Sequence, residues 1–219
     1  MEELQKRFNN FLAGDKQAFH ANLREPVFKT VLSHSKTPMK DFEAILALYT
    51  SSASTADEKI AALSSVGAVG DMAVIERILA MVLETGGAIK LQDSMYPVVS
   101  LASLSPLKEK VLQVLWDWLV KNWPALHKSL SPTLTLLGRI VQACVSSNIG
   151  EDFALTVEAW ARGDGLGDEA KADQVKKVKN VQRPLDQALE AMRGNTKWYE
   201  TAKQEVAAFF ASAEFAAPQ

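Results

Sequence analysis

Apolar residues recur every three or four positions along most of this chain, and short polar or glycine-containing breaks separate the segments that carry them. Phe42, Ile45, Leu46 and Tyr49 form one such set. This spacing matches the α-helix, which brings positions i, i+3, i+4 and i+7 to one face. No run shows the alternation of apolar and polar residues that is typical of a half-buried strand. The pattern predicts an all-α protein with about ten helices.

Helix-start signals agree with this pattern. Three dipeptides place a hydroxyl residue, suited to the N-cap, before a proline, suited to the first helical position: Thr37-Pro38, Ser105-Pro106 and Ser131-Pro132. Thr55 and Glu58 have the spacing of a capping box, and the helix that they open is expected to end at Gly67. Asp71 is the expected N-cap of the next helix.

Helices joined by short connections pack by default as antiparallel neighbours. Helix pairs in series are typical of an α-solenoid, although the sequence shows no clean repeat. We therefore predict an irregular HEAT-like α-superhelix of antiparallel helix pairs, built as a single helical domain over residues 1–219. The glycine-rich stretch from Arg162 to Asp168 and the lysine-rich residues after it predict a mobile connection over residues 162–183.

Composition and charge exclude several classes of protein. The 219 residues are 47% hydrophobic and 23% charged, which suits a folded globule and not a disordered chain. A formal net charge of -2 offers no basic footprint for nucleic acid. No apolar stretch has membrane-spanning length, and the amino-terminal residues lack the apolar core of a signal peptide. We expect a soluble, cytoplasmic protein without nucleic-acid or membrane partners.

Candidate chemistry is sparse. The three histidines, His20, His34 and His127, match no metal-binding motif, and no serine occupies a G-x-S-x-G motif. The one cysteine, Cys144, lies in an apolar run without a neighbouring basic residue, so we expect a buried core thiol and a reducing compartment. The sequence therefore names no catalytic and no metal-ligating residue. An enzyme whose site is assembled only by the fold stays open as a distant alternative.

Three other features have structural interpretations. The stretch from Gly163 to Asp168 lacks the spacing of a calcium or phosphate loop and predicts a flexible turn. A lysine cluster broken by acidic residues predicts a solvated helix face: Lys171, Lys176, Lys177 and Lys179. Trp116, Trp118 and Trp123 cannot all share one helical stripe, so at least one is expected at the edge of the core or in a groove.

Several phrases, taken in order, carry a resemblance to a known family. They are Phe11 to Asp15 (FLAGD), Asn22 to Arg24 (NLR) leading to Val27-Phe28, the run from Trp116 to Trp123, the segment from Pro132 to Ile140, and the segment from Leu185 to Trp198. Together they resemble the carboxy-terminal helical domain of gluzincin zinc aminopeptidases, of the puromycin-sensitive and endoplasmic-reticulum aminopeptidase branch. The resemblance covers nearly the whole chain.

The resemblance implies that the catalytic residues belong to a separate, preceding domain, which carries a G-A-M-E-N loop and an H-E-x-x-H zinc motif. Neither motif occurs here, so this chain alone lacks the ligands and the base that make a zinc-bound hydroxide. We therefore expect no catalysis and no cofactor in this chain, with zinc held by the catalytic domain. The implied partners are that catalytic domain and a peptide substrate.

The resemblance further implies a concave helical cap that encloses a substrate chamber and helps to select peptides. Gln92 and Asp93, in the segment from Lys90 to Tyr96, fall where family members present polar residues to the substrate. Arg24 is a third candidate for substrate contact, with a structural salt bridge as its alternative role. For Gln92 and Asp93 the alternative is an ordinary exposed or capping side chain.

Two hypotheses follow from these observations. The preferred one is a non-catalytic cap of a zinc aminopeptidase, and its alternative is a free-standing α-solenoid interaction module without enzymatic activity. A cap on its own exposes the surface that covers the catalytic domain, so self-association is expected as well.

Overall fold

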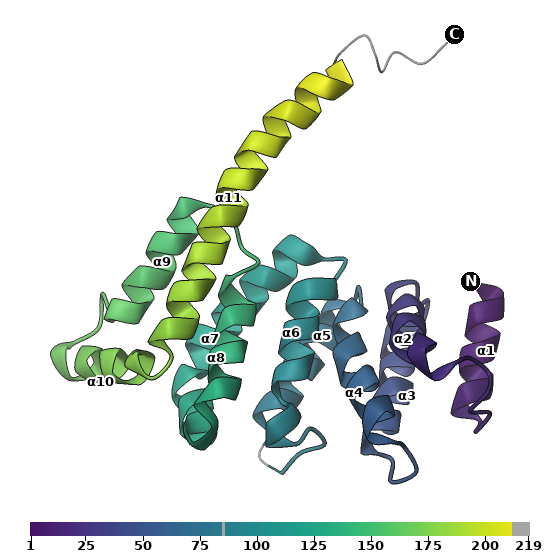
Figure 1. The fold of residues 1–219 in the computed structure, drawn as a ribbon. Coiled ribbons are helices and arrows are strands. Elements are labelled where there is room, and N and C mark those ends of the chain that lie inside the picture. The colour runs from purple at the N-terminus through teal and green to yellow at the C-terminus, as the bar shows by residue number, and fades with distance from the viewer. Residues whose placement is uncertain (85, 212–219) are drawn as a thin grey trace. The chain divides into compact units, whose positions relative to one another are not determined.

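The computed structural model describes residues 1–84 and 86–211, and within them it shows eleven α-helices, four 3-10 helices and no strand (Figure 1). The α-helices are α1 (Glu2–Leu12), α2 (Arg24–Ser33), α3 (Pro38–Thr50), α4 (Ala56–Ser65), α5 (Met72–Leu83), α6 (Met95–Leu104), α7 (Lys108–Leu130), α8 (Leu134–Val145), α9 (Glu151–Arg162), α10 (Asp168–Lys179) and α11 (Gln182–Ala211). The 3-10 helices are η1 (Ala21–Leu23), η2 (Val66–Ala68), η3 (Leu91–Asp93) and η4 (Ser131–Thr133). The all-α prediction is confirmed for these residues, and none of their helices is both long and apolar enough to cross a membrane.

The chain divides into two compact units, an amino-terminal unit of residues 1–144 and a carboxy-terminal unit of residues 145–219. The boundary falls at the last residues of α8, so each unit has its own set of packed helices. The expectation from the sequence that residues 1–219 form a single domain stays a prediction.

The helices of the amino-terminal unit stack in two rows. In one row α2 packs on α4 and α4 on α6, and in the other α3 packs on α5 and α5 on α7 (Figure 1). Contacts of α3 with α2 and α4, and of α6 with α5 and α7, join the rows. This packing of alternate helices is the arrangement of an α-solenoid. The HEAT-like description stays an interpretation, because no repeated sequence supports it.

Most of the expected helix starts are confirmed. Thr37 occupies the N-cap position of α3, with Pro38 after it, but its side chain makes no cap hydrogen bond. The Thr55 capping box opens α4, and Asp71 accepts a hydrogen bond from Val74 N at the start of α5. Ser131 is not an N-cap as expected, because η4 (Ser131–Thr133) has Leu130 as its N-cap and α8 follows it at Leu134.

Ser105-Pro106 also departs from the prediction, because α7 begins only at Lys108. The Ser105 hydroxyl accepts from Leu107 N and donates to the Val69 carbonyl, so it holds a turn between α6 and α7 and caps no helix. Serine hydroxyls bond readily to nearby backbone groups in turns, and here Ser105 makes such bonds and does not cap a helix.

Gly67 does not end the helix as the sequence suggested, because α4 already ends at Ser65. It lies inside η2, fully buried, and its N–H donates to the Ser100 hydroxyl of α6 at 3.0 Å. A Cβ on Gly67 would lie 2.0 Å from the Ser100 carbonyl carbon and 2.2 Å from Leu101 N. The absence of a side chain is what lets η2 approach the backbone of α6.

The tryptophans of α7 are all inside the protein. Trp116, Trp118 and Trp123 are 5%, 8% and 1% exposed, so the expectation that one of them lies at the edge of the core or in a groove is wrong. Helix α7 packs against α5, α6 and η4, and these neighbours cover more than one of its stripes. Cys144 is also buried, as expected, and burial raises the pKa of its thiol well above the usual range.

The carboxy-terminal unit is built from α9, α10 and α11. Helix α9 ends at Gly163, which adopts φ +67°, and Asp164 N donates to the Ala159 carbonyl in the pattern of a helix-ending turn. The expected turn at residues 163–167 is therefore present, but most of the predicted connection over 162–183 is helix α10. Lys171 and Lys176 lie on its exposed face, while Gln174 and Val178 are buried. Mobility of this segment stays a prediction.

Candidate functional site

A cavity of about 500 Å³ in the amino-terminal unit contains two of the three candidate residues, Gln92 and Asp93. Helices α3, α4 and α6 form its walls, and η3 with the loop before it forms the rim. Its lining side chains are Tyr49, Thr50, Ser52, Ala56, Lys59, Ile60, Leu63, Ala88, Lys90, Gln92, Asp93 and Tyr96. Two lysines and one carboxylate give the lining charges of both signs.

Tyr49 organises the rim of this cavity. Its hydroxyl donates to Asp93 Oδ2 at 2.8 Å and accepts from the backbone N–H of Lys90 at 3.0 Å. Because Tyr49 projects from the rigid helix α3, these two bonds fix η3 and the loop before it to the helical core. Asp93 lines the cavity and is half-buried, and Gln92 beside it is exposed.

The pKa of Tyr49 is raised to about 12: burial is the largest cause, the hydrogen bond to Asp93 and the charge of Asp93 also raise the pKa, and the Lys90 N–H lowers it in part. The phenol therefore stays protonated at neutral pH and donates its proton to Asp93. The sequence alone identifies Tyr49 only as part of the apolar face of its helix. A buried tyrosine hydroxyl usually has a hydrogen-bond partner. That general requirement is the one feature of the sequence that could have indicated a polar partner for Tyr49.

Replacing Tyr49 with phenylalanine is expected to lower the free energy of unfolding by about 1–2 kcal/mol, since Asp93 and Lys90 N lose a buried partner. Urea denaturation followed by circular dichroism measures this loss. Tyr96→Phe is the matched control, because Tyr96 lines the same cavity and is half-buried, and a change within about 0.5 kcal/mol is expected for it. Equal stability of the two variants would contradict the anchoring role of Tyr49.

A second cavity, of about 450 Å³, lies beside the first and shares Lys90 with it. The end of α5, the loop after it and the last turns of α7 line it, mostly with apolar side chains. They include Val82, Leu83, Ile89, Leu91, Leu126 and Leu130. The two cavities thus lie next to each other on one unit. We call the first the polar cavity and the second the apolar cavity after the side-chain types in their linings, although polar atoms contribute a similar share of both surfaces.

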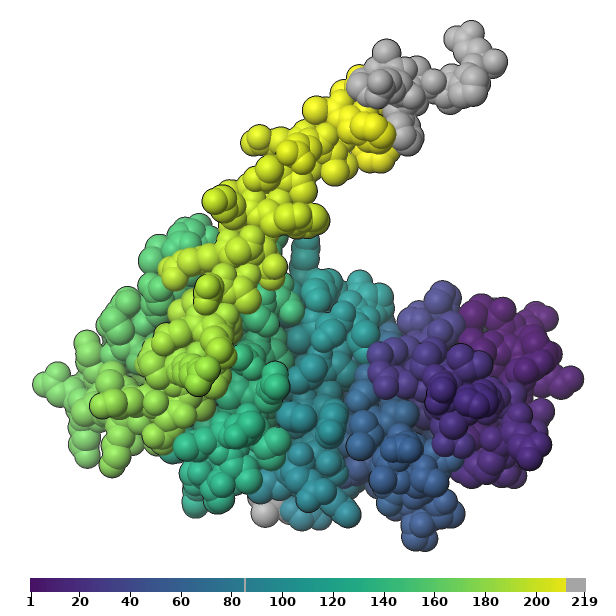
Figure 2. All heavy atoms as spheres, viewed as in Figure 1, coloured from purple at the N-terminus to yellow at the C-terminus, as the bar shows by residue number. Residues whose placement is uncertain are grey.

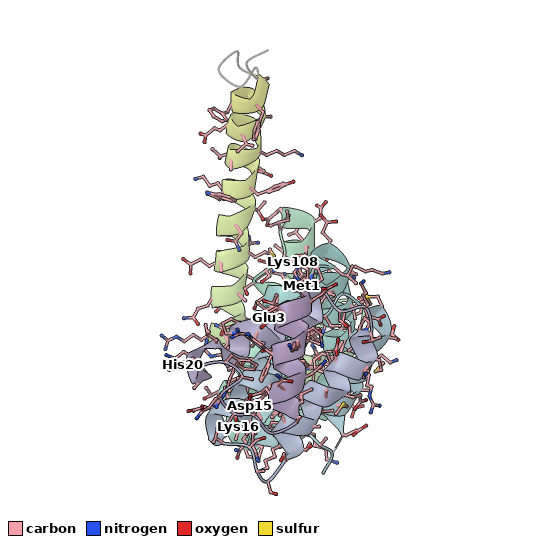
Figure 3. All side chains as sticks on the ribbon, turned by 90° about the vertical axis from the view of Figure 1, so that its right-hand side faces the viewer. Met1, Glu3, Asp15, Lys16, His20 and Lys108 are labelled. Atoms are coloured by element: carbon pink, nitrogen blue, oxygen red, sulfur yellow. The ribbon has the colours of Figure 1, made fainter. Side chains whose placement is uncertain are left out.

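Arg24, the third candidate, does not line either cavity. Its Nη2 atom lies 3.4 Å from Glu58 Oε1, and Lys16 Nζ lies 3.0 Å from the same oxygen. Lys16 comes from the loop after α1 (Figure 3), and Arg24 opens α2. This is the structural salt bridge that the sequence left as the alternative role, and substrate contact by Arg24 stays a prediction.

The three histidines lie in different elements, and each contacts residues close to it in the sequence. His20 accepts a hydrogen bond from Asn22 N in front of η1, His34 contacts Ser33 and the Thr30 carbonyl, and the His127 ring lies 5.7 Å from that of Trp123. Within residues 1–84 and 86–211, no three histidine, cysteine or carboxylate side chains gather where they could hold a metal ion.

This chain is similar to known proteins over most of its length. A family described as the ERAP1-like C-terminal domain matches residues 1–194. The chain is 30% identical to Aminopeptidase 2 of Candida albicans over 87% of its own length and 18% of that protein. It is 27% identical to mitochondrial Aminopeptidase 2 of Saccharomyces cerevisiae over 88% of the chain and 18% of the relative. With mouse glutamyl aminopeptidase it shares 27% identity over 73% of the chain and 15% of the relative.

The chain therefore spans about a fifth of the length of the curated relatives that it matches, and these relatives are aminopeptidases. The family match covers both cavities and extends through most of the carboxy-terminal unit. The resemblance noted in the sequence is confirmed: this chain belongs to the family of ERAP1-like C-terminal domains.

Proposed function

We propose that this chain acts as the non-catalytic cap of a zinc aminopeptidase, where it covers the catalytic domain and contributes to the choice of peptide substrates. The observation that carries the proposal is the family match over residues 1–194, together with relatives that are all named aminopeptidases. In this proposal zinc and the catalytic base belong to the catalytic domain, and the assembled enzyme works in the cytoplasm.

The two adjacent cavities are the proposed peptide-contacting surface. Asp93 offers a carboxylate, Lys59 and Lys90 offer cations, and Gln92 offers both a donor and an acceptor, so the polar cavity suits the amide groups and charges of a peptide. The apolar cavity beside it suits a hydrophobic side chain of the same peptide. Tyr49 supports this surface by holding Asp93 in place.

A chimera tests the proposal. The segment of Candida albicans Aminopeptidase 2 that matches this chain is replaced by residues 1–219, and hydrolysis is measured on amino-acid amides and on peptides of increasing length. We expect the chimera to hydrolyse both classes of substrate with a peptide-length preference that differs from that of the parent. The purified chain alone is expected to hydrolyse neither, with or without added zinc. Zinc-dependent activity of the chain alone would overturn the proposal.

Variants of the polar cavity sharpen the test. In the chimera, Asp93→Asn and Gln92→Ala are expected to raise KM for peptides by about threefold or more while kcat for a small amide stays unchanged. Asp117→Asn is the matched control, because it removes the same charge from an exposed position on α7, outside both cavities. Identical peptide kinetics for all three variants would remove Gln92 and Asp93 from the proposed surface.

The alternative is a free-standing interaction module that keeps the fold without an enzyme. It predicts that the chimera loses peptide hydrolysis although it folds, and that the chain gives no change in rate when mixed with a catalytic domain. Length-dependent kinetics in the chimera would exclude this alternative.

A further inference from the structure

Two lysines line the polar cavity without a direct counter-charge. On the face that Figure 2 shows, side chains fill the space between the helices of the amino-terminal unit, and the polar cavity is a hollow of about 500 Å³ in this unit. Lys59 lines the cavity from α4 and Lys90 from the loop before η3. Within residues 1–84 and 86–211, neither ammonium group makes an ion pair or a hydrogen bond.

The remaining polar groups of the lining leave this positive charge in excess. The Tyr96 hydroxyl, from α6, makes no hydrogen bond within the described part of the chain, so it is available as a donor. The Asp93 carboxylate already accepts from the Tyr49 hydroxyl at 2.8 Å. Glu84 lines the apolar cavity and not this one. Two lysines and one aspartate therefore give the lining a net charge of +1.

A carboxylate is the group that fits these donors. Ammonium and phenolic hydroxyl groups donate hydrogen bonds, and such bonds are shorter and stronger when the acceptor is ionised. A cationic ligand would meet two like charges for each opposite one. The whole chain has a formal net charge of -2, so its overall field does not attract anions and any preference for them is local.

The size of the polar cavity favours a peptide over a folded domain as the source of the carboxylate. Pockets for small ligands have volumes of about 300–1,000 Å³, and the polar cavity lies within this range. A side chain and the backbone around it fit such a hollow. A domain interface instead spreads over about 800 Å² of surface on each partner.

We propose that the polar cavity is a carboxylate subsite, in which Lys59, Lys90 and Tyr96 bind a carboxylate of the peptide. This inference rests on the proposed function, because it names the chemical class of peptide that the cap selects. The carboxylate comes from an acidic side chain or from the carboxyl end of the peptide. Tyr49 is a positioning residue, since its hydroxyl accepts from the backbone N–H of Lys90 at 3.0 Å and so fixes the point from which that lysine extends.

Four alanine-based pentapeptides test the proposal in NMR shift titrations of the isotope-labelled 219-residue chain. Three have blocked ends and carry glutamate, glutamine or lysine at the centre, and the fourth has a central glutamine and a free carboxyl end. We expect a carboxylate to improve binding about fivefold over the blocked glutamine peptide, because Lys59 is half-buried and Lys90 is exposed. The gain appears with glutamate if the source is a side chain, and with the free end if the source is the terminus. The lysine peptide should bind most weakly.

Lysine variants locate the effect. Lys59→Gln and Lys90→Gln are each expected to reduce the carboxylate advantage to about twofold or less. Lys121→Gln is the matched control, because Lys121 is an exposed lysine of α7 outside both cavities, and with it the advantage should stay near fivefold. Circular dichroism establishes that each variant keeps the helical fold.

Three results would overturn the carboxylate subsite. They are an absence of shifts with all four peptides, equal binding with and without a carboxylate, and a carboxylate advantage that Lys59→Gln and Lys90→Gln leave unchanged. Failure of the cap function is a different result, because the chimera would then show no peptide hydrolysis although the chain alone still prefers a carboxylate. Length-dependent hydrolysis by the chimera together with equal binding of all four peptides would remove the subsite and leave the cap function in place.

Discussion

Replacing Gly67 with alanine is expected to lower the free energy of unfolding of the amino-terminal unit by about 3 kcal/mol or more. The new Cβ would meet the Ser100 carbonyl oxygen at 2.2 Å as well as the neighbouring backbone atoms of α6. Backbone atoms inside a helix cannot move aside as a flexible side chain does, so η2 and α6 must separate. Separation also stretches the hydrogen bond from Gly67 N to the Ser100 hydroxyl. Chemical denaturation of the purified variant measures the loss.

Gly194→Ala is the control for this prediction. Gly194 lies within α11 and is exposed, and a Cβ there would meet nothing within 4 Å. Alanine is the better helix former, so a gain of about 0.5–1 kcal/mol in local helix stability is expected, seen as slower amide hydrogen exchange in α11. If Gly67→Ala were as harmless as Gly194→Ala, close packing of η2 on α6 would not be the reason for the glycine.

Local signals predicted most of the helices in this chain, because the information for a helix lies within a few residues. The Thr55 capping box and the Asp71 cap need only neighbours three positions away, and both are present. Gly67 shows the limit of such reasoning. A glycine after a run of apolar residues indicates a helix end, but the requirement for a missing side chain comes from Ser100, 33 positions later.

The sequence likewise indicated some residues of the candidate site and not others. Gln92 and Asp93 came from the family resemblance, and they share a cavity in the structure. Tyr49 was missed as a partner of Asp93, because a bond across 44 positions leaves no local pattern. The tryptophans of α7 were misjudged for a related reason. The sequence of a helix shows which side chains share a stripe, but the number of stripes that are buried depends on the helices packed against it.

Removing the carboxylate of Glu58 is the second change with a large expected effect. Glu58 is 1% exposed, and Glu58 Oε2 accepts from Thr55 N at 2.8 Å while Glu58 Oε1 meets Lys16 and Arg24. Glu58→Ala removes one half of the capping box and leaves the mostly buried Arg24 without its counter-charge. A loss of about 2–4 kcal/mol in the free energy of unfolding is therefore expected, measured by urea denaturation at neutral pH. Glu109→Ala, in the exposed first turn of α7, is the control and should cost less than about 0.5 kcal/mol.

The effect of Glu58 should also depend on pH. Burial raises the pKa of this carboxyl, but the Thr55 N–H, Lys16 and Arg24 outweigh burial and hold the pKa below its usual range. A lowered pKa in the folded state means that the ionised group stabilises the protein above the unfolded value, about 4.3, and that this stabilisation is lost as the pH falls through the folded value. Glu58→Gln keeps an acceptor for Thr55 N without the charge. Its deficit relative to the parent chain should therefore be full at pH 7 and shrink as the pH falls below about 4.3. A deficit that stays constant across this range would mean that shape and hydrogen bonding, and not the ion pairs with Lys16 and Arg24, account for the stabilisation.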